Sequence, residues 1–263
     1  MNEVKKIKVE KNLKESLKAL LKDLGGISLF VKPGDIVLIK PNFNTADPFP
    51  ASTDFAFLKA VTEIVYEEGP QQIIIGDSST MSLDTRKVME ELNIFGLEKI
   101  GKRVKVVVFE EEKWVKRNIP SGKYLKSVTV PAILEKIDKL ILLPCLKTHS
   151  IAQFTGALKL SVGFMKPWQR SLLHLRRIQE KIAELNFLIN PNLIIMDARK
   201  CFINQGPSKG EVQEPNLILA STSRLAIDIE GIKLIQSYPG NSLLNIKPEE
   251  LPQIRRAQEL GIR

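Results

Sequence analysis

The sequence has 263 residues, of which 43% are hydrophobic and 26% are charged, and its formal net charge is +9. This composition is typical of a globular chain with a sizeable core, and it excludes disorder over most of the length. No apolar run approaches the roughly 18–20 residues of a transmembrane helix, and the N-terminus lacks the apolar stretch of a signal peptide. We therefore expect a cytoplasmic protein with no membrane segment, built as a single α/β domain over residues 1–263.

Cysteine content and charge limit the classes of site that the chain can hold. Cys145 and Cys201 are its only cysteines and have no C-x-x-C spacing, so the chain alone cannot form an all-cysteine zinc or iron–sulfur centre. The positive charge favours anionic partners, but lysine and glutamate are abundant together, as in heat-adapted proteins. A solvated surface, a small anionic ligand and nucleic acid all remain open as explanations of the charge.

Short runs rich in β-branched residues alternate with helical stretches along the chain, which predicts a mainly parallel sheet with crossover helices. The predicted strands cover residues 35–40, 72–76, 104–109, 139–144, 193–197 and 216–220. Apolar residues at helical spacing predict helices over residues 53–68, 167–188 and 224–237. Two runs, 114–119 and 124–130, flank a Pro-Ser-Gly turn and predict a hairpin at the sheet edge. The expected architecture is a three-layer α/β fold with an edge hairpin.

Polar residues directly follow most of the predicted strands. Because the carboxyl ends of parallel strands lie on one edge of a sheet, we expect these residues to meet in a crevice there. They are Lys40 and Asn42 after the first strand, Asp77, Ser78 and Ser79 after the second, Lys147, Thr148 and His149 after the fourth, Asp197 after the fifth, and Ser221, Thr222 and Ser223 after the sixth.

Each of these residues also has an ordinary structural interpretation. Asp77 and its serine neighbours suit a helix cap, and Lys40 suits an exposed rim. In the functional interpretation, Asp77 accepts a hydrogen bond or binds a metal, while serine hydroxyls hold an anion. Lys147 then supplies a fixed positive charge, and His149 a group that titrates near neutrality.

Three further segments carry candidate residues. Lys159 ends a Gly-Ala-Leu-Lys run and either joins the crevice or lies on the surface. The glycine-rich loop over residues 204–210, which includes Gly206 and Gly210, resembles an anion-binding loop or a lid. Asp228 lies one turn into the last predicted helix, where it faces either solvent or the crevice. The sequence contains no Walker, G-x-G-x-x-G, H-E-x-x-H or G-x-S-x-G motif.

In this order, these residues resemble the family known as domain of unknown function 362. The matching segments are Lys40-Pro41-Asn42, Gly76-Asp77-Ser78, Leu143-Pro144-Cys145-Leu146-Lys147-Thr148-His149, Gly156-Ala157-Leu158-Lys159, Asp197, Gly206-Pro207 with Gly210, and Ala226-Ile227-Asp228. The resemblance covers almost the whole chain but implies no established reaction. Many similar proteins carry a ferredoxin-like cysteine cluster, which this sequence lacks, so an electron-transfer role would require an iron–sulfur partner.

The favoured hypothesis is an enzyme or binder that acts on a small anionic ligand, a carboxylate or a phosphate. Its catalytic residues would be His149 as general acid or base, Lys147 and Asp77. Asp77, Asp197 and Asp228 are the candidates for orienting that base or holding a divalent metal. The substrate-binding candidates are Lys40, Asn42, Ser78, Ser79, Thr148, Lys159, Gly206 and Gly210.

Two other classes of function remain as alternatives. Lys166, Arg170, Arg176 and Arg177, beside Trp168, could form a basic stripe that binds nucleic acid, although only 6% of residues are aromatic and no nucleic-acid motif is visible. The chain could instead be a non-catalytic partner of an iron–sulfur protein. The sequence does not indicate an oligomeric state.

Overall fold

The computed structural model describes residues 3–10 and 12–263. Its strands are β1 (Val4–Lys8), β2 (Ile36–Lys40), β3 (Gln72–Asp77), β4 (Val104–Val108), β5 (Trp114–Asn118), β6 (Ser127–Pro131), β7 (Lys139–Leu142), β8 (Cys145–His149), β9 (Gln153–Thr155), β10 (Leu193–Phe202), β11 (Val212–Gln213) and β12 (Leu217–Ser221). The α-helices are α1 (Leu13–Asp23), α2 (Phe55–Glu67), α3 (Thr85–Glu91), α4 (Ala157–Leu160), α5 (Pro167–His174), α6 (Ile178–Leu185), α7 (Arg224–Gln236) and α8 (Pro252–Glu259).

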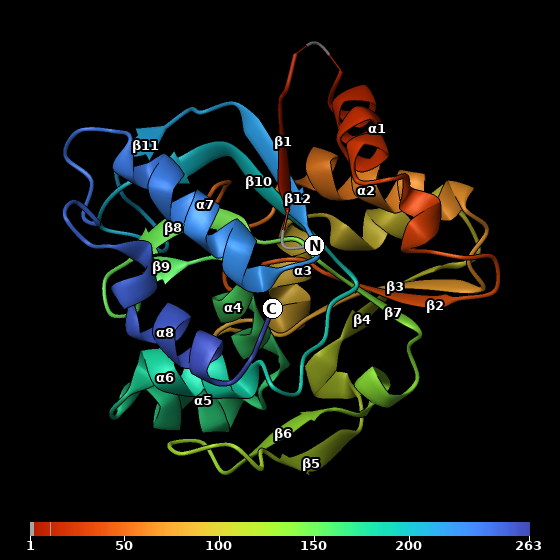
Figure 1. The fold of residues 1–263 in the computed structure, drawn as a ribbon. Helices are drawn as coiled ribbons and strands as arrows, with labels where there is room; N and C mark the ends of the chain where they lie inside the picture. The colour runs from red at the N-terminus through yellow and green to blue at the C-terminus, as the bar shows by residue number, and fades with distance from the viewer. Residues whose placement is uncertain (1–2, 11) are drawn as a thin grey trace.

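The central sheet has the strand order β1-β12-β10-β7-β2-β3-β4 (Figure 1). From β10 to β4 every neighbouring pair is parallel, whereas β12 runs antiparallel to both β1 and β10. The long strand β10 pairs first with β7 and then with β8, which forms an antiparallel hairpin with β9. The mainly parallel α/β sheet that the sequence predicts is therefore confirmed.

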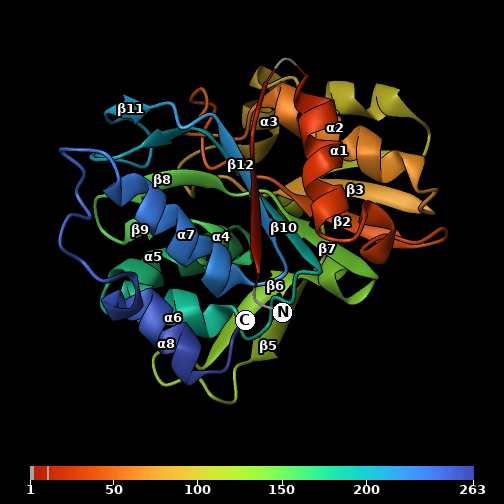
Figure 2. The same cartoon turned by 45° about the horizontal axis from the view of Figure 1, so that its top comes forward.

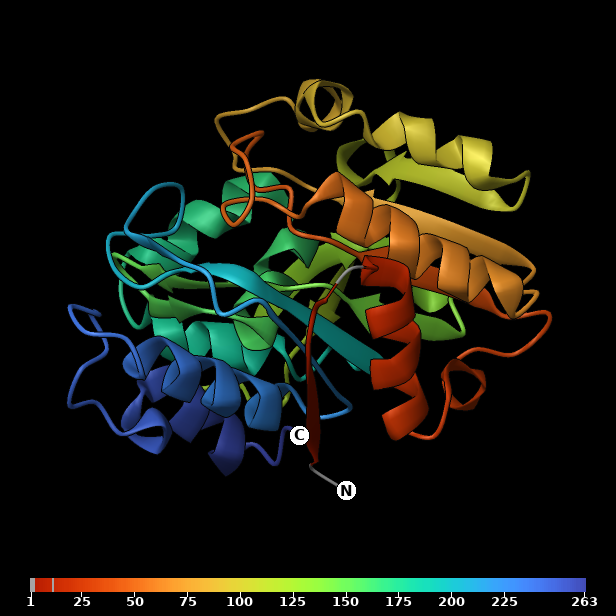
Figure 3. The same cartoon turned by 90° about the horizontal axis from the view of Figure 1, so that it is seen from above.

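Helices cover both faces of this sheet (Figures 2 and 3). Side chains alternate along each strand, so Val37 and Ile39 of β2 pack against the layer of α1, α2 and α3, while Leu38 faces the opposite layer. That opposite layer contains α4, α6, α7 and α8. The helix starts are fixed locally: Asp54 caps α2 by accepting from the amide of Phe57 at 2.9 Å. None of the helices in the described part of the chain is both long and apolar enough to cross a bilayer.

The hairpin of β5 and β6 forms its own two-stranded sheet, which corrects its expected position at the edge of the main sheet. Val128 and Val130 of β6 pack with Leu173 of α5 and Leu185 of α6, so the hairpin lies against these two helices (Figure 1). The carboxylate of Glu184 in α6 holds the turn in place by accepting three backbone N–H groups from the segment between the two strands.

The helix predicted over residues 167–188 is in fact two helices, α5 and α6. Arg177 lies between them with φ of 58°, a left-handed conformation that ends a right-handed helix. Cys201 lies buried in β10. Cys145, the first residue of β8, is buried as well.

Candidate functional site

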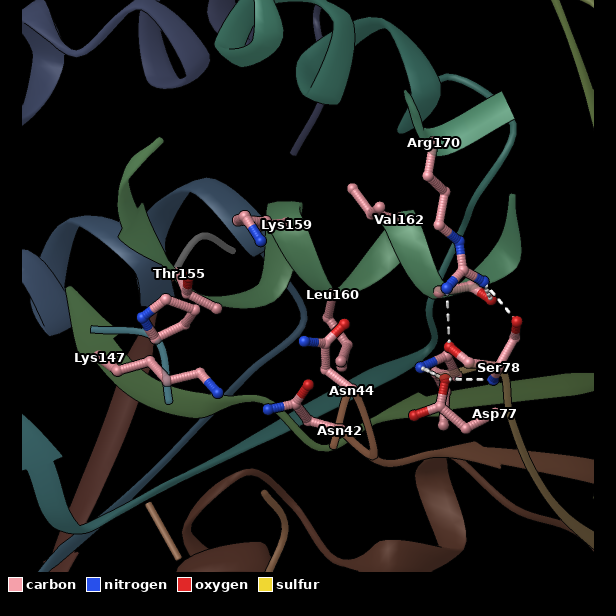
Figure 4. Close-up of a pocket in the computed structure, with 13 residues that line it drawn as sticks. Asn42, Asn44, Asp77, Ser78, Lys147, Thr155, Lys159, Leu160, Val162 and Arg170 are labelled. Carbon is pink, nitrogen blue, oxygen red and sulfur yellow. Dashed lines mark hydrogen bonds and ion pairs between the residues drawn. The ribbon is translucent and has the colours of Figure 1, made fainter. Parts of the chain in front are cut away.

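A small pocket lies beyond the carboxyl ends of β2 and β3, between the sheet and helices α4 and α5 (Figure 4). Its volume is about 60 Å³, which corresponds to about four to six water-sized groups. The lining residues are Lys40, Asn42, Asn44, Asp77, Ser78, Lys147, Thr155, Lys159, Leu160, Val162, Gly163, Arg170 and Pro207. The site thus collects strand ends, as the parallel sheet requires, together with residues of the helical layer above them.

An ion pair between Lys40 and Asp77 forms the floor of the pocket, with a distance of 2.6 Å between Nζ and Oδ1. Both side chains are buried, and desolvation lowers the pKa of Lys40 while Asp77 opposes that effect. Asp77 also accepts from the backbone amides of Phe43 and Ser78, each at 2.6 Å. A side chain at Gly163 would collide with this pair, because a Cβ there would lie 2.6 Å from Lys40 Nζ. Asp77 therefore anchors the loops after β2 and β3.

Arg170 enters the pocket from α5 and is only 6% exposed. Its guanidinium donates to four backbone carbonyls and, at 2.5 Å, to the hydroxyl of Ser78. That hydroxyl in turn donates to Glu110 at 2.6 Å. Burial lowers the pKa of Arg170, but a guanidinium remains protonated in proteins, so the pocket keeps this positive charge. Figure 4 shows Asp77, Ser78 and Arg170 joined by these bonds, and we call them the anchor side.

Lys147 of β8 and Lys159 of α4 approach the pocket from the opposite side (Figure 4). The ammonium of Lys147 donates to the carbonyl of Ala51, and its burial lowers its pKa. Lys159 makes no hydrogen bond or ion pair with any of residues 3–10 and 12–263. Burial, and then the positive charges of Lys147 and Arg170, lower the pKa of Lys159 to about 7. Near neutral pH its amine is therefore present in both the charged and the neutral form.

Three uncharged polar side chains lie beside these two lysines. Thr155 is buried, and its hydroxyl has no hydrogen-bond partner within the described structure. Asn42 donates from its amide nitrogen to the carbonyl of Ala51 at 3.0 Å, and Asn44 is exposed at the pocket mouth. We call Lys147, Lys159, Thr155, Asn42 and Asn44 the open side, because hydrogen-bonding capacity is left unused there.

Comparison with known proteins places the chain in a family. A model of the family described as "Domain of unknown function (DUF362)" matches residues 37–233. The chain belongs to this family. It is 27% identical over 259 residues to the thylakoid-associated protein sll1697 of Synechocystis sp., and the match covers 95% of this chain and 76% of that protein.

A solved structure shares the fold of this DUF362 chain. It is the lactate racemase apoprotein from Thermoanaerobacterium thermosaccharolyticum, with a TM-score of 0.51 and 12% sequence identity. The match covers 81% of this chain and 53% of that one, so the DUF362 chain spans about half the length of its structural neighbour. At this level of identity the likeness concerns the fold alone.

Of the candidate residues, the structure brings six into the DUF362 pocket: Lys40, Asn42, Asp77, Ser78, Lys147 and Lys159. His149, expected to share the crevice, is not among the lining residues, which corrects its position. Its Nδ1 accepts from the backbone amides of Ile151 and Ala152, at 3.1 and 3.2 Å. The imidazole therefore fixes the turn between β8 and β9.

Four other predicted binding residues do not line the pocket. Thr148 follows Lys147 on β8 and therefore faces the other side of the strand, where its hydroxyl accepts from the amide of Gly206 at 3.3 Å. The hydroxyl of Ser79 donates to a carbonyl in the loop after β2. Gly206 and Gly210 permit close backbone contacts, since a Cβ on either would lie 2.1 Å from a carbonyl oxygen. Of the loop over residues 204–210, Pro207 reaches the pocket.

The three candidate metal ligands do not come together. Asp197 pairs with Arg199 at 2.7 Å, and burial raises the pKa of this aspartate against the effect of that arginine. Asp228 accepts from the amides of Ala157 at 2.6 Å and Leu158 at 3.0 Å, and burial raises its pKa to about 7. The described residues contain no group of three or more His, Cys, Asp or Glu side chains that could hold a metal. Asp77 lines the pocket, whereas Asp197 and Asp228 do not.

Sequence reasoning missed several pocket residues. Arg170 was assigned to a basic stripe for nucleic acid, but it is buried and faces inward, so that stripe is interrupted. Thr155 was missed because β9 is too short to give a strand pattern. Asn44 could have been predicted, since it lies in the same polar segment as Lys40 and Asn42.

Proposed function

We propose that this DUF362 protein binds a small anion, a carboxylate or a phosphate, on the open side of the pocket. The observation that carries the proposal is an excess of cationic side chains around the pocket. Four cationic side chains line the pocket against a single carboxylate, Asp77, and that carboxylate is already paired with Lys40. Buried charges are normally compensated, and a bound anion would supply the missing negative charge.

The polar groups of the open side suit such a ligand. Lys147 uses one of its three donors on a carbonyl, so two N–H groups remain, and the Thr155 hydroxyl is unused within the described residues. A volume of about 60 Å³ fits a ligand of about four to six non-hydrogen atoms, the size of phosphate or of a three-carbon acid. Lactate is a suitable probe because it has this size and because the protein of similar fold is a lactate racemase.

If the anion is transformed rather than only bound, Lys159 is the group we expect to transfer protons. An acid–base group works best when its pKa lies near the working pH, and the pKa of Lys159 is about 7. Lys159 replaces His149 in this role because the histidine does not line the pocket.

Thermal unfolding with added ligands tests the proposal. We would compare phosphate, lactate, acetate, Mg²⁺ and duplex DNA at two salt concentrations. A ligand at about a hundred times its dissociation constant should stabilise the protein by about 2.7 kcal/mol. Phosphate or lactate should give such a shift, and Lys147→Gln and Lys159→Gln should each remove most of it. Lys247→Gln, at an exposed lysine that does not line the pocket, is the matched control.

Other results would point elsewhere. A shift with DNA alone, present only at low salt, would favour the basic surface, because phosphate-backbone contacts weaken steeply with salt. A shift with Mg²⁺ alone would favour a metal site of a different kind, because the described residues contain no cluster of three or more His, Cys, Asp or Glu side chains. A shift with phosphate that both pocket variants retain would show that the anion binds outside this pocket. An iron–sulfur partner stays a prediction, and its recovery in pull-downs would test it.

A further inference from the structure

The three lysines of the pocket differ in what already occupies their amines. Lys40 is bound by Asp77 and by the carbonyl of Pro41, at 2.6 and 2.8 Å, and Lys147 is bound by the carbonyl of Ala51. Lys159 has no such partner in the part of the chain that the structure describes, although it lines the same small cavity. Its amine is therefore the one that a ligand reaches without breaking an existing bond.

The surroundings of Lys159 also favour the neutral amine, which is the nucleophilic form. Burial and the charges of Lys147 and Arg170 bring its pKa to about 7. At neutral pH, the neutral fraction of such an amine is about a thousandfold larger than that of an ordinary surface lysine. Lysines in this situation, desolvated and next to other cations, are the ones that attack carbonyl carbons.

We propose that Lys159 forms an imine with a small oxo acid, an inference that rests on the proposed anion-binding function of the same pocket. The neutral amine attacks the carbonyl carbon of the ligand, and a carbon–nitrogen bond forms. The two amine protons move to the former carbonyl oxygen, which leaves as water. The products are one imine and one water molecule, and the step needs no oxidant, reductant or metal.

Neighbouring side chains supply the remaining contacts of this reaction. Lys147 holds the carboxylate of the oxo acid with the donors that the carbonyl of Ala51 does not use. The unpartnered hydroxyl of Thr155 is available to hydrogen-bond the oxygen of the addition intermediate before it leaves. The cavity restricts the ligand to about four to six non-hydrogen atoms, so a three-carbon oxo acid fits and a long-chain acid does not.

Reductive trapping tests the proposal on the intact protein. The protein is incubated with pyruvate and cyanoborohydride, which reduces an imine to a stable amine, and the modified peptides are identified by mass spectrometry. We expect a carboxyethyl group on Lys159 at least about tenfold more often than on any other lysine, given its larger neutral fraction. The modification should increase with pH up to about 7 and then level off, whereas surface lysines should continue to react faster above pH 9.

Variants and a second ligand separate this inference from the proposed function. Lys159→Arg retains a positive charge but cannot form an imine, so lactate should still stabilise it while trapping is lost. Lys247→Arg should trap pyruvate on Lys159 as the unmodified protein does. If Lys159→Arg does not fold, the site and pH dependence of trapping in the unmodified protein decide the question.

Each outcome has one meaning. Selective trapping at Lys159 supports the imine. Stabilisation by both lactate and pyruvate, with no adduct or with adducts spread evenly over the lysines, overturns the imine and leaves anion binding intact. Absence of stabilisation by every anion, with no selective adduct, overturns the proposed function and this inference together.

Discussion

Three lysines of one pocket show how partners, rather than residue type, decide what a side chain can do. Lys40 is paired with Asp77 and serves as a structural anchor. Lys147 is bound to a carbonyl and keeps free donors, which suits it to hold an anion. Burial, and then the positive charges of Lys147 and Arg170, lower the pKa of Lys159 to about 7, and its amine has no partner among the residues that the structure describes. Chemical reactivity in this pocket is thus expected at Lys159.

Asp228 provides a test of how the short helix that carries Lys159 is held. Its carboxylate accepts from the amides of Ala157 and Leu158, and the aspartate is fully buried. Asp228→Ala leaves both buried donors without a partner, at about 1–3 kcal/mol each, so we expect the free energy of unfolding to fall by about 2–6 kcal/mol. Urea denaturation measures this change.

The control for that substitution is Asp84→Ala, which removes an exposed cap. Asp84 accepts from a single amide, that of Lys87, at 3.2 Å. Loss of such a cap costs about 1 kcal/mol. Equal losses from the two substitutions would show that the bonds of Asp228 contribute no more than a surface cap.

At the scale of elements, Glu184 of α6 connects the hairpin of β5 and β6 to helix α8. Its buried carboxylate accepts three amides from the turn between β5 and β6 and pairs with Arg256 of α8 at 2.9 Å. Glu184→Ala leaves a half-buried arginine and three amides without this partner. An amide left without its partner typically costs about 1–3 kcal/mol, so we expect the loss of three such bonds to lower the free energy of unfolding by about 3 kcal/mol or more in chemical denaturation.

Glu259→Ala is the matched control because Glu259 pairs with the same arginine, also at 2.9 Å, but is 52% exposed. An exposed pair contributes about 0–1 kcal/mol. Hydrogen exchange should show in addition that Glu184→Ala exposes the amides between β5 and β6, whereas Glu259→Ala does not. Unchanged protection of these amides in Glu184→Ala would contradict the role of Glu184 in holding the hairpin.

The sequence predicted the elements whose patterns are local. β2, β3 and α2 match their predicted ranges closely because their apolar residues repeat regularly and a cap or turn ends each run. β8 and β9 were missed because their polar residues give no alternation, and their pairing with each other and with β10 is a long-range effect. The predicted hairpin forms, but its docking on α5 and α6 depends on Glu184, whose role no local pattern reveals.

The same difference between local patterns and long-range packing explains which residues of the candidate site were predicted. Lys40, Asn42, Asp77 and Ser78 were predicted because parallel strands bring their carboxyl ends together. Arg170 could not be predicted because it comes from a helix whose orientation is set by tertiary packing. The sequence did not predict β8 as a strand, so it did not predict that Lys147 and Thr148 point to opposite sides of it.

At the scale of the whole molecule, the pocket lies where the sheet meets its second helical layer, so its charges bear on the stability of the entire fold. Residues of β2 and β3 form its floor, and residues of α4 and α5 form its roof. Unfolding exposes the pocket lysines to water, where their usual pKa values return. The pH dependence of unfolding therefore reports on the pocket directly.

We expect opposite effects of pH on the unliganded and the liganded protein. Lys40, Lys147 and Lys159 all have lowered pKa values in the folded state, and that of Lys159 is about 7 instead of 10.5. Between pH 7 and 10 these three lysines therefore bind more protons in the unfolded chain than in the folded protein, and their contribution to the free energy of unfolding should rise with pH. Allowing for the partial exposure of Lys159, its contribution to this rise should be about 1–2 kcal/mol.

Lactate keeps its negative charge throughout this range, but the ammonium of Lys159 that attracts it is lost as pH rises. The extra stability that lactate provides should therefore decline above pH 7, while the contribution of the pocket lysines to the stability of the unliganded protein increases. Thermal unfolding from pH 6 to 10 at constant ionic strength measures both trends. Lys159→Met should remove the lactate trend and reduce the rise in the unliganded protein by the share of Lys159, since the methionine carries no proton to lose while Lys40 and Lys147 still titrate. A lactate effect that stays constant from pH 6 to 10 in the unmodified protein would separate Lys159 from anion binding and leave Lys147 as the binding cation.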